Sequence, residues 1–230
     1  MRESSRNHSR GRPAAVGIGP KVSLSTFFRD QGPYVCGALA LPVLALSILA
    51  ATLVTPGYSH VTDTISHLGG REGPRPWVFN TGFFLGGLLV LGFAYGFARQ
   101  FGASTWGKLL TALLVINATT AIFAAIFEST WGAAPLDASV VGDSIHEIAA
   151  RASFTALTTA MVLFPVVVWQ RPEWRGVLWL FLALAISAVL FGLLFLFEVF
   201  AEYSGVIQRV FFAMCGIWLE VVSIQSLRIK

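Results

Sequence analysis

Long apolar runs separated by short polar stretches dominate this chain. Each run holds about twenty residues, the length that a helix needs to cross a hydrocarbon core roughly 30 Å thick. The six runs lie near residues 34–55, 78–98, 107–127, 148–169, 177–199 and 207–227. This pattern predicts an all-α integral membrane bundle of six transmembrane helices. In the second run Gly82 and Gly86 stand four residues apart, a spacing that lets helices approach closely in lipid.

Residues 1–33 differ in composition from the rest of the chain. They are rich in Ser, Arg, Gly and Pro and show no apolar periodicity, which predicts a disordered basic tail before a six-span domain at 34–230. Over the whole chain 55% of the residues are hydrophobic and 12% are charged, whereas soluble domains carry about 25% charged residues. The composition therefore excludes an ordinary soluble protein.

The basic residues are divided unevenly between the two ends of the predicted spans. Twelve of the sixteen lysines and arginines fall on the side of both termini, and only Arg71 and Arg75 fall in connections on the other side. Because basic connections remain in the cytoplasm, both termini are predicted to be cytoplasmic, with the first, third and fifth connections outside. This topology accounts for the net charge of +4. The predicted partner is therefore the lipid bilayer and not a nucleic acid, while a protein partner or a homo-oligomer stays open.

The first connection contains a polar segment with the start and stop signals of a helix. Pro56 and Gly57 end the first span, and Gly69 would end a new helix, so a short helix is predicted from about residue 60 to 68. At about 100° per residue, its polar face carries His60, Asp63 and His67. The opposite face is aliphatic, as expected for an interfacial helix in the first outer connection.

A second polar segment, at the start of the fourth span, echoes the first. Its polar stripe holds Asp143, His146, Glu147 and Arg151. Glu147 and Arg151 have the i,i+4 spacing of a helical ion pair. Since the predicted topology places both segments on the same side of the membrane, an extracytoplasmic Asp/His/Glu/Arg cluster is expected there.

The cluster has three interpretations, of which the first is structural or binding. His60, Arg151 and Arg209 would then hold a ligand or partner, or form ion pairs that lock the connections over the bundle. Another interpretation is a small-molecule transporter. Against it, no span carries an ionisable residue at its midplane, which coupled carriers usually need.

The remaining interpretation is a metal-dependent hydrolase that acts on a lipid or lipid-linked substrate. Carboxylate and imidazole groups suit zinc or iron. The candidate ligands are Asp63, His67, Asp143 and His146. A metal-bound water would attack the substrate with Glu128 or Glu147 as general base. Ser66 with a histidine base is an alternative nucleophile, although no special turn surrounds it.

One part of the sequence resembles a known family. The segment from Tyr58 to Gly69, with its pattern Asp-x-Ile-Ser-x-Leu-Gly, and Asn80-Thr-Gly82 after it, resemble the signature of bacterial six-helix membrane proteins called domain of unknown function 998. The resemblance covers roughly residues 34–227 and implies a six-span fold in a bacterial cytoplasmic membrane, with no activity attached. The sequence departs from the family pattern at Glu128, where a proline is expected, and at His67, where an acidic residue is common.

Overall fold

The described part of the protein is helical. The computed structural model describes residues 24–70, 73–127 and 139–229, with the side chains of the last range described from Ile145 onward. The long helices are α2 (Gly32–Leu53), α3 (Pro76–Phe101), α4 (Thr105–Ile126), α5 (Ser139–Val168), α6 (Leu178–Leu196) and α7 (Ser204–Ile229). Six helices are long and apolar enough to cross a membrane. The predicted all-α, six-span, multi-pass architecture is therefore confirmed.

Short helices precede and connect these spans. They are α1 (Leu24–Asp30) and three 3-10 helices, η1 (Ile65–Gly69), η2 (Pro172–Val177) and η3 (Ala201–Tyr203). Residues 1–23 of the tail lie outside the described part, whereas residues 24–30, also placed in the tail by the sequence, form α1. The first span begins slightly earlier than predicted, at Gly32, because Pro33 is well suited to the first turn of a helix.

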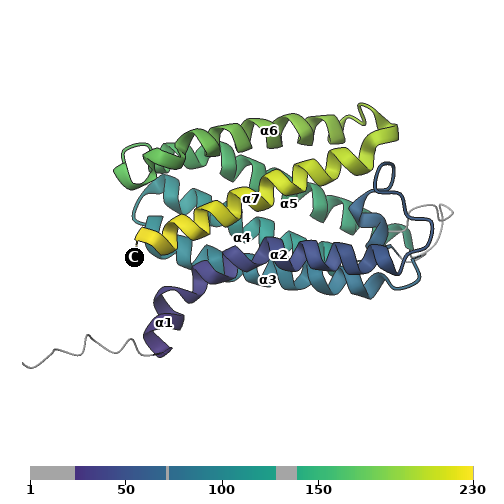
Figure 1. The fold of residues 1–230 in the computed structure, drawn as a ribbon, viewed down its shortest axis with the longest axis horizontal. Coiled ribbons are helices and arrows are strands. Elements are labelled where there is room, and N and C mark those ends of the chain that lie inside the picture. Colours follow the sequence, from purple (N-terminus) through teal and green to yellow (C-terminus); the bar gives the residue numbers. More distant parts are fainter. Residues whose placement is uncertain (1–23, 71–72, 128–138, 230) are drawn as a thin grey trace, which may run out of the picture.

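The six spans form a closed ring in chain order. Each span packs against the next one along the chain, and α7 closes the ring by packing against α2. Figure 1 shows α1 and the C-terminus at one end of the bundle and the first connection, after α2, at the opposite end. We call that opposite end, which carries the first and fifth connections, the distal end.

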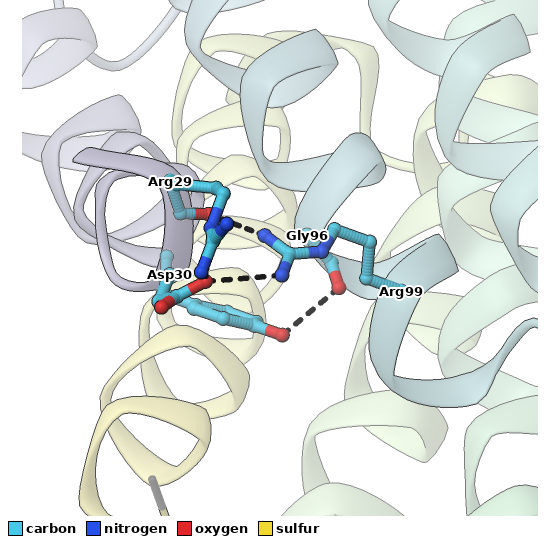
Figure 2. A network of polar contacts seen from close by, with 5 residues as sticks. Arg29, Asp30, Gly96 and Arg99 are labelled. Carbon is cyan, nitrogen blue, oxygen red and sulfur yellow. Dashed lines mark hydrogen bonds and ion pairs between the residues drawn. The ribbon is translucent and has the colours of Figure 1, made fainter. Parts of the chain in front are cut away.

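A polar network at the end near the termini attaches α1 to α3. Arg99 donates hydrogen bonds to the Arg29 carbonyl and, at 3.1 Å, to the Asp30 carboxylate, as Figure 2 shows. The Tyr34 hydroxyl donates to the Gly96 carbonyl at 2.9 Å. The hydrogen bond from Arg99 also lowers the pKa of the Asp30 carboxyl. Together these contacts fix the direction in which the chain enters the first span.

Large aromatic side chains fill the half of the ring nearest the termini. Phe164 lies at the centre of this packing, with ring centroids 4.9 Å from Phe181, 5.3 Å from Trp174 and 5.4 Å from Trp218, all edge to face. These rings are fully buried. Edge-to-face aromatic pairs of this kind stabilise a core beyond their buried area. The distal half of the ring holds a second aromatic group, in which the Phe154 ring lies 5.2 Å from that of Phe211 and 5.0 Å from that of Phe212, and the candidate site lies beside it.

Candidate functional site

The first connection folds into a turn and a short 3-10 helix. The predicted short helix is present, but it is shorter than expected, covers Ile65–Gly69 and has 3-10 geometry. Residues 59–63 form a separate turn, in which the Asp63 carboxylate accepts hydrogen bonds from the Ser59 N–H at 2.8 Å and the Thr62 hydroxyl at 3.0 Å. The Ile65 N–H donates to Gln208 Oε1 at 2.5 Å. Because Gln208 accepts the Ile65 N–H, this group is not available for the hydrogen bond to the carbonyl four residues earlier that a continuous α-helix would need.

The aliphatic side of the segment faces the bundle. Ile65 and Leu68 are each 1% exposed and pack in one cluster with Ala51 of α2 and Phe79 of α3. Asn80 of α3 also donates to the Gly69 carbonyl at 3.1 Å. The apolar packing of Ile65 and Leu68 and the hydrogen bond from Asn80 anchor the end of the connection. The polar backbone of the connection then lies beside α7.

The first two turns of α7 bind the backbone of this connection. The carbonyls of four successive residues, 60–63, each accept a hydrogen bond from α7. Ser204 Oγ donates to the Thr62 carbonyl at 2.6 Å, and the Val206 N–H donates to the Val61 carbonyl at 3.2 Å. The first N–H groups of a helix have no partner within the helix. The connection supplies an acceptor for one of them.

Arg209 is the centre of this α7–loop network. Its Nη1 donates to the carbonyls of His60 at 3.0 Å and Asp63 at 2.9 Å, and also to the Gly205 carbonyl at 2.8 Å. Its Nη2 donates to the Tyr58 hydroxyl, and its guanidinium lies 5.3 Å from the Tyr58 ring centroid. Among the described residues Arg209 forms no ion pair with an acid. Arg209 therefore ties α7 to the first connection through backbone carbonyls and a tyrosine.

Asp63 and His67 lie beside this network. Partial burial would raise the pKa of the Asp63 carboxyl, but the hydrogen bonds from Ser59 and Thr62, with the charges of His67 and Arg209, hold this pKa below its ordinary value. The half-buried ring of His67 lies 6.1 Å from the Tyr58 ring. The exposed His60 contributes its carbonyl to Arg209 and its ring to an edge contact with Tyr58 at 5.5 Å.

The structure brings together no metal site from the residues that it describes. In that part of the chain no three His, Cys, Asp or Glu side chains are placed to hold an ion. The Asp143 side chain and Glu128 lie outside the described residues. The zinc or iron site, and with it the hydrolase, therefore stays a prediction.

His146 connects the start of the fourth span to the end of the third. Its Nδ1 lies 2.8 Å from the Ala124 carbonyl oxygen and 2.9 Å from that of Phe127. Because carbonyl oxygens only accept hydrogen bonds, Nδ1 must carry the proton. In the neutral imidazole this leaves a lone pair on Nε2. That atom is buried and has no hydrogen-bond partner in the described part of the chain.

Glu147 and Arg151 form the i,i+4 ion pair that their spacing predicts. Their side chains are 62% and 64% exposed. Exposed helical pairs stabilise a protein by only about 0.3–0.5 kcal/mol. The pair therefore contributes little to stability, and its importance lies in the two charged side chains that it places at the surface.

A large cavity lies between the distal parts of α5, α6 and α7. Its volume is about 960 Å³, at the upper end of the roughly 300–1,000 Å³ of small-molecule sites. Polar groups line part of it, among them Thr62, Ser66, His146, Glu147, Arg151 and Glu198. Apolar groups line much of the rest, among them Phe154, Val189, Leu193, Phe195, Ile207 and Phe211. The cavity thus combines polar and apolar walls within a membrane bundle.

Small side chains explain why this space stays open. Ala150 of α5 and Ala188 and Gly192 of α6 line the cavity between the larger Phe154 and Phe211. The lining residues of α5 run from His146 to Thr159. At 1.5 Å per residue this stretch measures roughly 20 Å along the helix. The cavity is therefore deep enough to extend well into one leaflet of a bilayer.

Alanine at Gly205 is expected to lower the free energy of unfolding by about 2 kcal/mol. A Cβ atom there would lie 2.6 Å from the Asp63 carbonyl oxygen and 2.8 Å from those of His60 and Val61. Since these oxygens belong to hydrogen-bonded backbone, the connection would have to move away from α7. Thermal unfolding in detergent, followed by the reaction of a thiol-specific dye with buried Cys215, measures the loss.

The matched control is Gly176→Ala in η2. A Cβ at Gly176 would meet nothing within 4 Å, so its unfolding midpoint should stay near that of the unmodified protein. Equal midpoints for Gly205→Ala and Gly176→Ala would contradict the close approach of α7 to the connection.

The network uses residues that the sequence patterns did not single out as a site. Tyr58, Ser204 and Gln208 hold the connection by hydrogen bonds, whereas the polar patterns of the sequence pointed to acids and histidines. One signal was present in the sequence. Ser204 and Gln208 stand four residues apart at the start of an otherwise apolar span, and such a polar stripe needs partners inside the protein.

Comparison with known proteins adds a family and no activity. A family model described as "Protein of unknown function (DUF998)" matches residues 38–225. No curated protein and no solved structure matches the chain.

Proposed function

Because the chain belongs to the DUF998 family, which carries no assigned activity, we propose a function from the site itself: the protein binds an amphipathic molecule of the bilayer in the distal cavity. This is a ligand-binding role for a multi-pass membrane protein. The observation that carries it is the volume and mixed lining of the cavity between α5, α6 and α7.

The lining suits a molecule with one polar and one apolar part. The polar side chains nearest the distal end come from residues 146–151 of α5, from the first connection and from Glu198, just after α6. Deeper along α5 and α6, Phe154 and Val189 line the same space together with Thr155, Thr158 and Thr159. An apolar chain placed against these side chains would be removed from contact with water, while its head group would meet hydrogen-bonding groups.

The dimensions support a ligand from a single leaflet. The stretch of α5 that lines the cavity measures roughly 20 Å, and half of a hydrocarbon core measures roughly 15 Å. With both termini in the cytoplasm, as the distribution of basic residues predicts, this leaflet is the outer leaflet of a bacterial cytoplasmic membrane. The polar part of the cavity then lies at the extracytoplasmic head groups.

Filling the cavity with a tryptophan is expected to abolish binding. Thr158 lines the cavity, so the ring in Thr158→Trp would occupy space that the ligand needs. Native mass spectrometry of protein purified in mild detergent measures bound amphiphile, and a loss of at least about tenfold is expected, equivalent to 1.4 kcal/mol.

Ile148→Trp is the matched control for this experiment. Ile148 is an exposed residue of α5 outside the cavity lining, and its variant should retain the bound molecule. Absence of any amphiphile from the unmodified protein, or equal binding by Thr158→Trp, would overturn the proposed function.

A further inference from the structure

The charged groups around the cavity do not balance. Among the described residues, its charged lining consists of Glu147, Arg151 and Glu198. Arg151 is already paired with Glu147. Glu198 has no ion pair in the described part of the chain. The polar part of the cavity therefore presents one carboxylate without a compensating cation.

The fold after α6 holds this carboxylate at the cavity. Glu198 and Phe200 both have positive φ angles, of 51° and 64°, a conformation that costs residues other than glycine roughly 1–2 kcal/mol each. In this turn the Val199 N–H donates back to the Leu194 carbonyl at 3.0 Å. The turn reverses the chain into η3 and α7 and keeps Glu198 among the lining residues.

The imidazole of His146 adds a second acceptor. Its Nδ1 proton is shared by the carbonyls of Ala124 and Phe127, so the ring orientation is fixed from α4. The opposite nitrogen, Nε2, is buried without a partner among the described residues, and His146 lines the cavity. A buried acceptor of this kind is costly unless a ligand or water donates to it.

From these groups, and resting on the proposed function, we infer that the cavity selects amphiphiles whose head group donates hydrogen bonds, with a primary ammonium preferred over a phosphate. An ammonium carries three N–H donors and one positive charge. It can form a charge-assisted hydrogen bond with the Glu198 carboxylate, and an N–H that reaches the buried His146 Nε2 would satisfy the acceptor left open there. A phosphate offers only acceptors to both groups and is repelled by the unpaired Glu198 carboxylate, so it could bind only through the N–H groups of Arg151 that Glu147 leaves free.

Three photoreactive amphiphiles test this preference. They share one diazirine-bearing alkyl chain and differ in the head group, which is a primary ammonium, a hydroxyl or a phosphate. Each is added at the same mole fraction to nanodiscs of phosphatidylcholine that contain the full-length protein. Labelling of the α5, α6 and α7 peptides is divided by labelling of α2, where Leu46 and Leu49 are exposed and outside the cavity. This ratio removes the general attraction of the basic protein for anions.

The ammonium probe is expected to exceed the phosphate probe in this ratio at least about fivefold, the difference of roughly 1 kcal/mol between charge-assisted and neutral hydrogen bonds. A higher ratio for the phosphate, or equal ratios for all three, overturns the inference while leaving an amphiphile bound. Labelling of the cavity that never exceeds that of α2 for any probe removes the proposed function itself. The two failures are therefore distinguishable.

Paired substitutions identify the selective groups. His146→Asn keeps an amide donor near the Nδ1 position and removes the Nε2 acceptor, so the protein should stay folded while the preference for ammonium falls. Glu198→Gln removes the charge and should lower the ammonium-to-phosphate ratio toward one. Glu202→Gln is the control, because Glu202 is exposed in η3 and outside the cavity lining. Unchanged selectivity in both His146→Asn and Glu198→Gln overturns the inference.

Discussion

Arg209→Ala is expected to lower the free energy of unfolding by about 3 kcal/mol, because it removes the donor that several exposed and partly buried acceptors share. The guanidinium donates to the carbonyls of His60, Asp63 and Gly205 and to the Tyr58 hydroxyl. Alanine supplies none of these hydrogen bonds and also removes the cation from the face of the Tyr58 ring. At the distal end water can reach some of the freed carbonyls, which limits the loss.

Two further variants separate the hydrogen bonds of Arg209 from its charge. Arg209→Lys keeps the charge but not the planar fork of donors, so it should recover less than half of the loss. Arg75→Ala removes an exposed arginine at the same end of the bundle and should change the midpoint little. Thermal unfolding in detergent is the measurement. A midpoint for Arg209→Ala equal to that of Arg75→Ala would contradict the role of the network.

The α7–loop network and the cavity have residues in common. Thr62 and Gln208 take part in the hydrogen bonds between α7 and the first connection, and both also line the cavity. Arg209 itself is outside that lining. A ligand in the cavity would therefore contact the connection that Arg209 holds, without contacting Arg209. Stability and binding depend here on the same backbone, although on different side chains.

The bundle itself could be predicted from the sequence. A span must bury its backbone polar groups in its own helix and present apolar side chains to lipid, so twenty-residue apolar runs leave few alternatives. Most observed helices begin and end within a few residues of the predicted spans, and local signals set such boundaries at Pro76, at the start of α3, and at Ser104, whose hydroxyl accepts the Gly107 N–H at 3.0 Å before α4. The exception is α5, which begins at Ser139, well before residue 148, where the fourth span is predicted to start.

For the candidate site, the sequence indicated which segments to consider but not how their side chains are arranged. Helical periodicity placed His60, Asp63 and His67 on one face, but the segment is a turn followed by a 3-10 helix because Gln208, 143 residues away, accepts the Ile65 N–H. Periodicity also cannot reveal that the His146 ring bonds to carbonyls of α4. Such partners are set by the packing of distant helices. A cavity is harder still to predict from the sequence, because it depends on which small residues face one another in the folded bundle.

Gly82→Ala is expected to destabilise the bundle by about 3 kcal/mol or more. A Cβ at Gly82 would lie 2.0 Å from Ser47 Cβ and 3.5 Å from Ser47 Cα of α2. Rotation of the serine side chain cannot relieve this overlap, because Cβ is fixed to the backbone. The two helices would have to separate along a contact that positions both ends of the first connection. Unfolding in detergent should show the loss, and Ser47→Gly in the same chain should recover part of it.

Gly86→Ala, one helical turn along α3, should have the opposite sign. A Cβ there would meet nothing within 4 Å, and Gly86 lines a separate cavity of about 90 Å³. The methyl group fits this space, and alanine removes the conformational cost of a helical glycine, so stability should rise by roughly 0.5–1 kcal/mol. Both glycines belong to one small-residue pattern in the sequence, yet only Gly82 touches α2 closely. Similar effects of the two substitutions would mean that the pattern, and not the contact, determines packing.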